Sequence, residues 1–306
     1  MRVLVVGAGA IGGYFGGRLL EKDVDVTFLV RERRRKQLKE HGLIIESVNG
    51  NASFTPKTIV TGENADHFDL VILSTKAYHL EGAIEDIRPY VTEGTMIMPL
   101  LNGISHIQKL IDEFGKENVI GGLCSIESTL DNEGKILQTS ALNNLVFGEL
   151  TTKRTERILK VEELFSGTKV NYKLSDNVNQ DLWHKYLFIT TMSGITTLMR
   201  SSIGPIREEE SSYQTLKSLL KEIISLMNQV QAPLAENIEE IQLKQINGLG
   251  YPMKTSMQRD MEKSLPVEAD HLQGYLLEIA RKEGLSAPVL QAAYGNLKVY
   301  EGQLSK

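Results

Sequence analysis

Three glycines near the N-terminus constrain the fold of this chain more than any other feature. Gly7, Gly9 and Gly12 follow the branched apolar run of residues 3–6 and precede residues 13–20, which have the pattern of a helix. A strand that runs into G-x-G-x-x-G and then into a helix is the fingerprint of a dinucleotide-binding fold. The glycines allow a tight turn, a close approach of the backbone to a pyrophosphate, and close packing of helix on strand. This context favours a dinucleotide site over an ordinary glycine turn.

The loop between this strand and this helix is therefore the first candidate site. Free amide hydrogens and the positive dipole at a helix N-terminus bind phosphate groups. The predicted cofactor-binding residues of the loop are Gly7, Ala8, Gly9, Ala10, Ile11 and Gly12.

Arg31 bears on which dinucleotide is bound. It ends the second predicted strand, residues 24–30, where an enzyme that prefers NAD usually places Asp or Glu on the ribose 2′-hydroxyl. A guanidinium at this point can bind the 2′-phosphate of NADP. Four more cations follow, Arg33, Arg34, Arg35 and Lys36. We predict NADPH as the cofactor and Arg31 as its contact, and we expect most of the other four side chains to be solvated.

Residues 1–174 have the pattern of an α/β fold. Short β-branched runs alternate with helical stretches, as in a parallel sheet that is buried on both faces. The strands predicted for this sheet are residues 2–6, 24–30, 69–74, 95–100, 118–124 and 169–173. Two hairpins are also expected, one with residues 43–48 and 53–60 around Asn49-Gly50, and one at Glu133-Gly134 before residues 145–147. The expected fold is a Rossmann-type, doubly wound sheet.

After residue 174 the pattern becomes helical throughout, with prolines at or between helix starts. The predicted helices are residues 177–200, 206–230, 235–246, 254–264, 268–283 and 288–302. We therefore expect an NADP-binding Rossmann domain over residues 1–174 and an all-α substrate and catalytic domain over residues 175–306. A cleft between two domains is the usual place for a ligand.

Composition argues against several functional classes. Charged residues make up 24% of the chain and the net charge is −5, so a nucleic acid or an anionic membrane is not an expected partner. Cys124 is the single cysteine, and no spacing of cysteine and histidine suggests a metal site. No apolar run approaches the ~20 residues of a membrane span. We predict a soluble, cytoplasmic protein that acts on a small molecule; a monomer and a homodimer are both compatible with the sequence.

Two polar residues follow predicted strands of the sheet. Lys76 comes after residues 69–74, and Asn102 comes after residues 95–100. Ligands of open parallel sheets bind at the carboxyl ends of the strands. Both residues are candidates on position alone, against the alternatives of a surface lysine and a turn asparagine.

Taken together, the motifs resemble those of the ketopantoate reductases, also called 2-dehydropantoate 2-reductases. The resemblance runs from residue 2 to at least residue 283. The matching elements, in order, are Gly7, Gly9 and Gly12, then Lys76-Ala77, Asn102-Gly103, Trp183-His184-Lys185, and Ser256-Met257 followed by Glu268.

The resemblance implies an NADPH-dependent reduction of ketopantoate to pantoate, a step of pantothenate biosynthesis. It implies that Lys185 is the proton donor, with Lys76 as a second cation of the site. Asn102 would hold cofactor or substrate, Ser256 would bind the substrate and Glu268 would assist Lys185. From residue type alone, Ser256 could instead be a helix-face serine and Glu268 an acid that a helix N-terminus favours.

The sequence departs from the family at two positions of the expected substrate site. The best-known branch has asparagines four and eight residues after the catalytic lysine, where this chain has Ile189 and Ser193. This wall of the pocket is expected to be more apolar and to form fewer hydrogen bonds. The reaction type is retained in this interpretation, and another branched 2-oxo acid becomes an alternative substrate. A non-catalytic NADP(H)-binding sensor is a further alternative.

Overall fold

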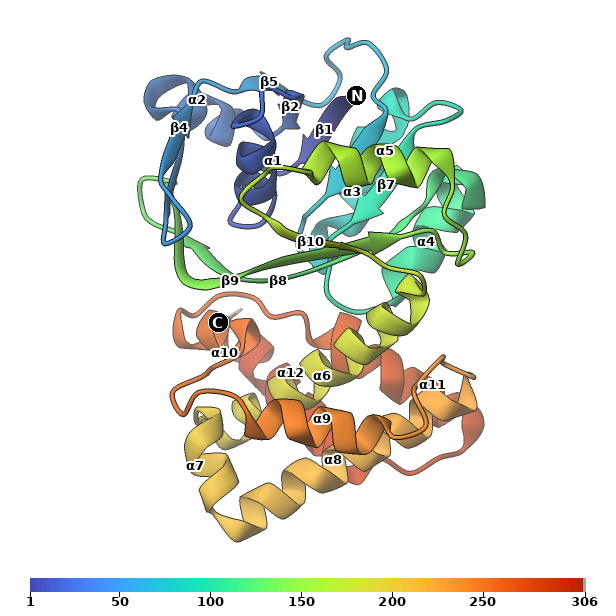
Figure 1. Ribbon diagram of the computed structural model, residues 1–306. Helices are drawn as coiled ribbons and strands as arrows, with labels where there is room; N and C mark the ends of the chain where they lie inside the picture. The colour runs from blue at the N-terminus through green and yellow to red at the C-terminus, as the bar shows by residue number, and fades with distance from the viewer. Residues whose placement is uncertain (305–306) are drawn as a thin grey trace. The chain divides into compact units, whose positions relative to one another are not determined.

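The computed structural model describes residues 1–304, which form two compact units (Figure 1). Unit 1 comprises Met1–Leu101 and His106–Asn179, and unit 2 comprises Asn102–Ser105 and the chain from Gln180 onward. The sequence pattern put a boundary after residue 174. The next five residues lie in unit 1, where the Asn179 side chain donates a hydrogen bond to the Leu150 carbonyl at 2.9 Å.

Unit 1 contains a five-stranded parallel sheet in the order β5-β2-β1-β6-β7. Its strands are β1 (Arg2–Val6), β2 (Asp25–Leu29), β5 (Lys57–Ile59), β6 (Leu70–Leu73) and β7 (Met96–Pro99). Both faces of β1 are buried, because Val3 and Val5 belong to one core cluster while Leu4 and Val6 belong to another. The helices that follow these strands are α1 (Gly12–Leu20), α2 (Glu32–His41), α3 (Leu80–Ile87) and α4 (Ser105–Phe114). The predicted Rossmann-type doubly wound sheet is confirmed.

The chain reverses its direction of winding at β1. From β1 it proceeds outward to β2 and β5, and it then returns to pair β6 with the other side of β1. Ligands of such sheets bind at the carboxyl ends of the strands beside this switch point. The glycine loop, residues 7–12, leaves the carboxyl end of β1.

A second sheet of mixed direction packs in the same unit. Its strands are β3 (Leu43–Ser47), β4 (Ala52–Phe54), β8 (Gly121–Leu130), β9 (Ile136–Gly148) and β10 (Asn171–Leu174), and α5 (Glu156–Phe165) precedes β10. The assignment of residues 118–124 and 169–173 to the parallel sheet was wrong, since β8 and β10 both pair with β9. A single parallel bridge, Ile97 to Val119, joins the start of this segment to β7.

Both predicted hairpins are present, although with different second strands. Gly50 adopts φ +106° in the turn between β3 and β4, but residues 57–59 leave this hairpin as β5 and pair with β2. Pro56, which lacks an amide hydrogen, separates β4 from β5. The hairpin at Gly134 is extended, because β9 begins at Ile136 and not near residue 145.

Unit 2 is helical. It contains most of α6 (Val178–Met199), followed by α7 (Ile203–Glu208), α8 (Glu210–Gln229), α9 (Ile238–Asn247), α10 (Ser256–Glu262), α11 (Tyr275–Glu283) and α12 (Pro288–Leu304). The single helix predicted over residues 206–230 is two helices, because Glu209 has extended ψ (120°) and its carboxylate accepts hydrogen bonds from the Ser211 and Ser212 amides. A π-helical turn, Asp270–Gly274, precedes α11.

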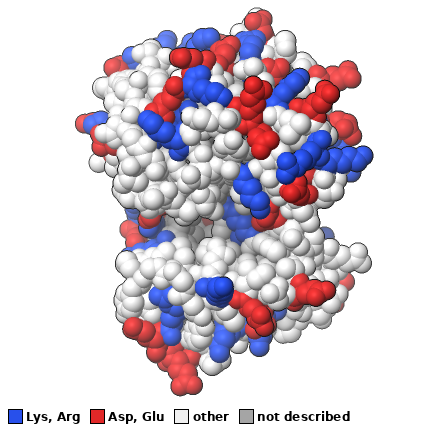
Figure 2. Space-filling view, in the orientation of Figure 1, with Lys and Arg blue, Asp and Glu red and all other residues white. Residues whose placement is uncertain are grey.

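The surface carries both signs of charge. Figure 2 shows basic and acidic side chains interspersed over the face in view, consistent with a net charge of −5. Within residues 1–304, the helices all fall short of the length and apolar character that crossing a membrane requires.

Candidate active site

The glycine loop has the geometry of a dinucleotide cradle. Gly7 has φ +90°, and its amide donates to the Leu29 carbonyl of the neighbouring strand at 3.0 Å. A Cβ at Gly12 would collide with the Gly7 carbonyl and with the hydroxyl of Ser74. The helix α1 is therefore packed tightly against the end of β1, and two of its first amides bond back to the loop, Gly13 to the Gly9 carbonyl at 2.8 Å and Phe15 to the Ile11 carbonyl at 3.0 Å.

Two features of the loop fit a bound dinucleotide. At Gly9 an added Cβ would meet no atom of the described residues within 4 Å, so protein packing alone does not require glycine there. The free space is what the backbone needs to approach a pyrophosphate. Close by in the sheet, at the end of β6, the Thr75 hydroxyl is buried and finds no hydrogen-bond partner among residues 1–304. Such a group is suited to a polar ligand.

Arg31 and the four cations that follow it differ in exposure and in their partners. Arg31 is exposed at the start of α2, directly after β2 and Val30, which suits a contact with a 2′-phosphate. Burial, and then the charge of Arg31, lower the pKa of His79. The expectation that most of the other cations are solvated holds only for Arg33 and Lys36, which are exposed. The other two, Arg34 and Arg35, have partners in the protein.

Arg34 and Arg35 are bound to protein acceptors. Arg35 forms an ion pair with Glu63 at 2.6 Å. Arg34 donates from Nε to the Ala8 carbonyl at 3.0 Å and from Nη2 to the Gly134 carbonyl at 2.9 Å. Only two of the four cations are therefore solvated, where most were expected to be, because folding brings these carbonyls and this carboxylate to α2.

Lys76 lies at the carboxyl end of β6, as predicted. It is half-buried, has extended backbone (φ −69°, ψ 149°) and precedes a short 3₁₀ turn, whose His79 amide donates to the Lys76 carbonyl at 2.9 Å. Lys76 thus shares unit 1 with the glycine loop and with Arg31.

Asn102 belongs to unit 2, where a histidine fixes its loop. His271 Nε2 lies 2.7 Å from the Asn102 carbonyl, which can only accept, so this nitrogen carries the proton. The other ring nitrogen lies 3.2 Å from the Ser105 hydroxyl. Gly103 has φ +89°, and a Cβ there would lie 2.6 Å from His271 Nε2. The Asn-Gly pair therefore forms a tight turn held against the histidine ring.

Lys185 and Glu268 lie on segments that are bonded to one another. Lys185 is half-buried on α6, and the next residue, Tyr186, donates from its hydroxyl to the Leu272 carbonyl at 2.6 Å. Burial raises the pKa of Tyr186 well above its ordinary value, so this hydroxyl remains a donor. Glu268 is buried, and its carbonyl accepts from the Leu272 amide at 3.1 Å. The π-helical turn thus links Asn102, the Lys185 helix and the Glu268 segment.

The two positions where the sequence departs from the family differ in environment. Ile189 is half-buried, one helical turn after Lys185. Ser193 is only 1% exposed, and its hydroxyl accepts a 2.8 Å hydrogen bond from Gln273 Nε2. The Ser193 hydroxyl is therefore already engaged by the protein.

The remaining residues of the family motifs differ in exposure and in partners. Ser256 is exposed at the first position of α10, whose cap is Thr255. His184 is half-buried, and its Nε2 accepts from the Ala235 amide at 3.1 Å, so it fixes the segment before α9. Trp183 packs beside Tyr186, with 6.0 Å between the centroids of the two rings.

Sequence reasoning missed three residues that organise the site. Arg34 was recognised only as a surface cation, and His271 and Gln273 were not singled out. No motif marks His271 and Gln273, since their importance comes from contacts with Asn102 and Ser193, which lie 169 and 80 positions away in the chain.

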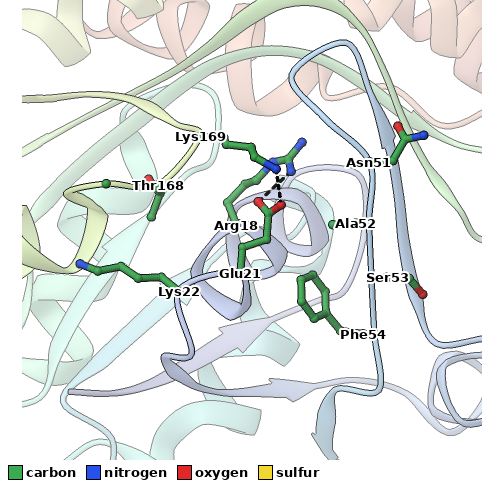
Figure 3. Close-up of a pocket in the computed structure, with 10 residues that line it drawn as sticks. Arg18, Glu21, Lys22, Asn51, Ala52, Ser53, Phe54, Thr168 and Lys169 are labelled. Atoms are coloured by element: carbon green, nitrogen blue, oxygen red, sulfur yellow. Dashed lines mark hydrogen bonds and ion pairs between the residues drawn. The ribbon is translucent and has the colours of Figure 1, made fainter.

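A separate hollow lies at the far end of α1 from the glycine loop (Figure 3). It has a volume of about 490 Å³, and its lining includes charged side chains that pair with one another. Glu21 accepts from Arg18 at 2.8 Å and from Lys169 at 2.7 Å. Its lining includes no residue of the glycine loop, so this hollow is distinct from the candidate cofactor site.

Comparison with known proteins shows the family to which the chain belongs. Residues 3–152 match the family described as ketopantoate reductase PanE/ApbA, and residues 177–301 match its C-terminal counterpart. An uncharacterized oxidoreductase, YkpB of Bacillus subtilis (strain 168), is 47% identical over 303 residues, covering 99% of this chain and 100% of that protein.

Two solved structures have the same fold. The 2-dehydropantoate 2-reductase of Geobacter metallireducens GS-15 superposes with a TM-score of 0.87 at 26% identity, covering 98% of this chain and 99% of the other. D-mandelate dehydrogenase, in a ternary structure with NADH and anilino(oxo)acetate, superposes with a TM-score of 0.88 at 22% identity, covering 100% of both chains. With both domains matched, the chain belongs to the ketopantoate reductase family of NADP-dependent oxidoreductases.

Proposed function

We propose that this protein uses NADPH to reduce a 2-oxo acid to a 2-hydroxy acid, with 2-dehydropantoate as the first substrate to test. That substrate would give the enzyme a role in pantothenate biosynthesis. The observation that carries the proposal is the linkage of the Asn102 turn, the Lys185 helix and the Glu268 segment by hydrogen bonds within unit 2. In this proposal unit 1 is the NADP-binding domain and unit 2 is the substrate and catalytic domain.

The proposed chemistry needs one hydride and one proton. When bound, NADPH supplies the hydride to the 2-carbonyl carbon. Lys185 delivers a proton to the carbonyl oxygen, which becomes the hydroxyl of the product, and the lysine then regains a proton from solvent. An ammonium suits this step because it stabilises the charge that develops on the oxygen.

The other residues position the reactants. Asn102 holds cofactor or substrate, and the His271 hydrogen bond keeps its turn in place. Lys76 adds positive charge at the end of β6, Ser256 binds the substrate and Glu268 assists Lys185. The ammonium groups of Lys76 and Lys185 attract the substrate carboxylate.

The far end of the substrate is expected to meet a more apolar wall. The Ile189 side chain cannot form a hydrogen bond, and the Ser193 hydroxyl already accepts one from Gln273. A substrate hydroxyl facing Ile189 would lose water without gaining a partner, at a cost of about 1 to 3 kcal/mol. This favours, as a second candidate, another branched 2-oxo acid, and the likeness to D-mandelate dehydrogenase supports that candidate at the level of fold.

A kinetic assay tests the proposal directly. Oxidation of NADPH, followed by its absorbance, is measured with 2-dehydropantoate and a panel of branched, linear and aromatic 2-oxo acids. We expect turnover with at least one branched acid. Binding of NADPH with no turnover on any acid of the panel would instead support a non-catalytic sensor.

Substrate selectivity provides a second test. The ratio of kcat/KM for 2-dehydropantoate over its deoxy analogue, 2-oxo-3,3-dimethylbutyrate, should be well below the ~10⁴ of a hydrogen-bonding specificity site. Ile189→Asn should raise this ratio, whereas Ile189→Leu, which preserves the apolar wall, should leave it unchanged. A native ratio above ~10⁴ would show that Glu268 or another group binds the hydroxyl and that Ile189 is of little importance.

A further inference from the structure

Two side chains from outside the glycine loop hold its carbonyl groups. Arg34, on α2, donates from Nε to the Ala8 carbonyl at 3.0 Å. Ser128, on β8, donates from its hydroxyl to the Ala10 carbonyl, also at 3.0 Å. The two contacts come from different elements and reach alternate residues of the loop, so the loop is held at two points.

Holding a carbonyl also orients the next amide. A trans peptide is planar, and its C=O and N–H bonds point in opposite directions. A hydrogen bond to the Ala8 carbonyl therefore turns the Gly9 amide away from Arg34, and one to the Ala10 carbonyl turns the Ile11 amide away from Ser128. These amides lie in the part of the fingerprint that approaches a pyrophosphate.

Arg34 is itself anchored by the hairpin between β8 and β9. Its Nη2 donates to the Gly134 carbonyl at 2.9 Å, and its Nη1 lies 3.4 Å from the Gln37 side chain. Gly134 has φ +83°, and a Cβ there would collide with Arg34 Nη1. The guanidinium thus connects the hairpin tip to the glycine loop, with its donors directed at protein acceptors.

The hairpin tip is fixed by an aspartate. Asp131 Oδ1 accepts from the Glu133 amide at 2.9 Å and from the Lys135 amide at 2.8 Å, which closes the turn. Burial lowers the pKa of Arg34, and the charge of Asp131 opposes this effect. The acid therefore both shapes the turn and favours the charged form of the arginine.

We propose that Arg34, Ser128 and the hairpin tip, residues 131–135, form a brace that pre-orients the glycine-loop amides for the cofactor pyrophosphate. In this assignment Arg34 is a positioning residue that serves NADPH and NADH alike. Recognition of the 2′-phosphate is left to Arg31, which is exposed. Two arginines three positions apart then have different functions, although the sequence presents them as one cationic cluster.

The brace predicts which ligands lose affinity when Arg34 is changed. In Arg34→Gln, the dissociation constants of NADPH, NADH and ADP-ribose should all rise by a similar factor, about tenfold. The affinity for 2′-AMP, which has the 2′-phosphate but no pyrophosphate, should be unchanged. Binding is measured by calorimetry or by competition with NADPH fluorescence, well below the melting temperature of each variant. Lys39→Gln removes one charge from the same helix and should change none of these constants.

Ser128 tests the second contact independently. Ser128→Ala should weaken the pyrophosphate-containing ligands in the same pattern, and Ser128→Thr, which keeps the hydroxyl, should restore their affinity. A loss restricted to NADPH and 2′-AMP in Arg34→Gln would assign Arg34 to the 2′-phosphate and overturn the proposal. Unchanged affinities would overturn it as well, and so would equal losses for all ligands including 2′-AMP, which would indicate general damage to unit 1. Because the readout is cofactor binding, the outcome is independent of which 2-oxo acid is reduced.

Discussion

At the scale of single residues, equal charge does not mean equal function. Arg31 and Arg34 both lie in the basic segment after β2, yet the first is exposed and the second is bound to two carbonyls. Likewise Lys185 is half-buried on α6, among segments bonded to the Asn102 turn, while many lysines of the chain are exposed. The environment of each side chain therefore decides which variants will be informative.

Arg31→Asp should weaken NADPH binding and leave NADH binding nearly unchanged. The variant loses a charge-assisted contact with the 2′-phosphate and adds repulsion, which together amount to ~1 to 3 kcal/mol. Dissociation constants for both cofactors measure the effect. Arg33→Asp, at an exposed neighbour with the same change of charge, should have a smaller effect on NADPH. Equal losses for NADPH and NADH in a folded Arg31→Asp protein would refute this role.

Lys185→Ala should lower kcat by ~10² or more while the dissociation constant of NADPH stays close to that of the wild type. The reason is that a proton donor acts in the reaction step and adds little to cofactor binding. Lys221→Ala, at an exposed lysine of α8, serves as the control and should retain full activity. A Lys185→Ala enzyme with wild-type kcat would mean that another group donates the proton.

At the scale of elements, the break between α7 and α8 shows how one carboxylate ends one helix and starts another. The Glu209 side chain accepts from the Ser211 amide at 3.0 Å and from the Ser212 amide at 2.6 Å. An acid at a helix N-terminus also interacts favourably with the helix dipole. The apolar pattern continues through this break, which is why the sequence predicted one helix over residues 206–230.

The cap should make the stability of unit 2 depend on pH. Hydrogen bonds from Ser212 and Ser211 lower the pKa of Glu209 to about 2, below its ordinary value in an unfolded chain. A lowered pKa stabilises the fold above the unfolded-state pKa of about 4.3, and this contribution is lost as the pH falls towards 2. Glu209→Ala should therefore lower the melting temperature at pH 7, by an amount that shrinks as the pH is lowered.

Thermal unfolding of both proteins between pH 7 and pH 3 tests this expectation. Glu283→Ala, at an exposed acid of α11, is the matched control and should show a much smaller change at pH 7. A difference between Glu209→Ala and the wild type that stays constant over the whole range would argue against an ionised cap.

At the scale of the whole molecule, each unit has a core of its own. In unit 1 two apolar clusters cover the two faces of the parallel sheet, and the second sheet joins one of them through Ile136, Leu145 and Phe147. In unit 2 the buried face of α8 includes Leu216, Leu219 and Ile223 at helical spacing. A ligand that binds one unit should thus stabilise that unit most directly.

NADPH should slow amide hydrogen exchange mainly in unit 1, at the glycine loop and α1. At a free concentration 100 times its dissociation constant, it should raise the free energy of unfolding of the binding unit by about 2.7 kcal/mol. Exchange followed by mass spectrometry compares these peptides with peptides from α8. Protection that is greatest in α8 and absent from the loop would contradict the assignment of the cofactor to unit 1.

The sequence by itself determined the parts of this protein that depend on local physics. The glycine loop was predictable because each glycine meets a local requirement. Gly7 has positive φ, Gly9 leaves open space, and Gly12 allows close packing of α1 on β1. The parallel strands β1, β2, β6 and β7 and most of the helices were predictable from the spacing of apolar residues, which depends only on the period of each element. The strand β5 was predicted instead as part of a hairpin. The family and its chemistry followed from motifs that remain in order along the chain.

Only the tertiary structure decided which distant segments meet. Residues 118–124 are largely apolar, whereas residues 169–173 alternate polar side chains with Val170 and Tyr172. Both edges of the long strand β9 are available for pairing, and β8 and β10 pair with them. The guanidinium of Arg34 is bound because the hairpin at Gly134 reaches it, and Ser193 is engaged because the π-helical turn brings Gln273 to α6. A residue pattern specifies the period of an element, whereas the choice of partner depends on contacts between residues far apart in the chain.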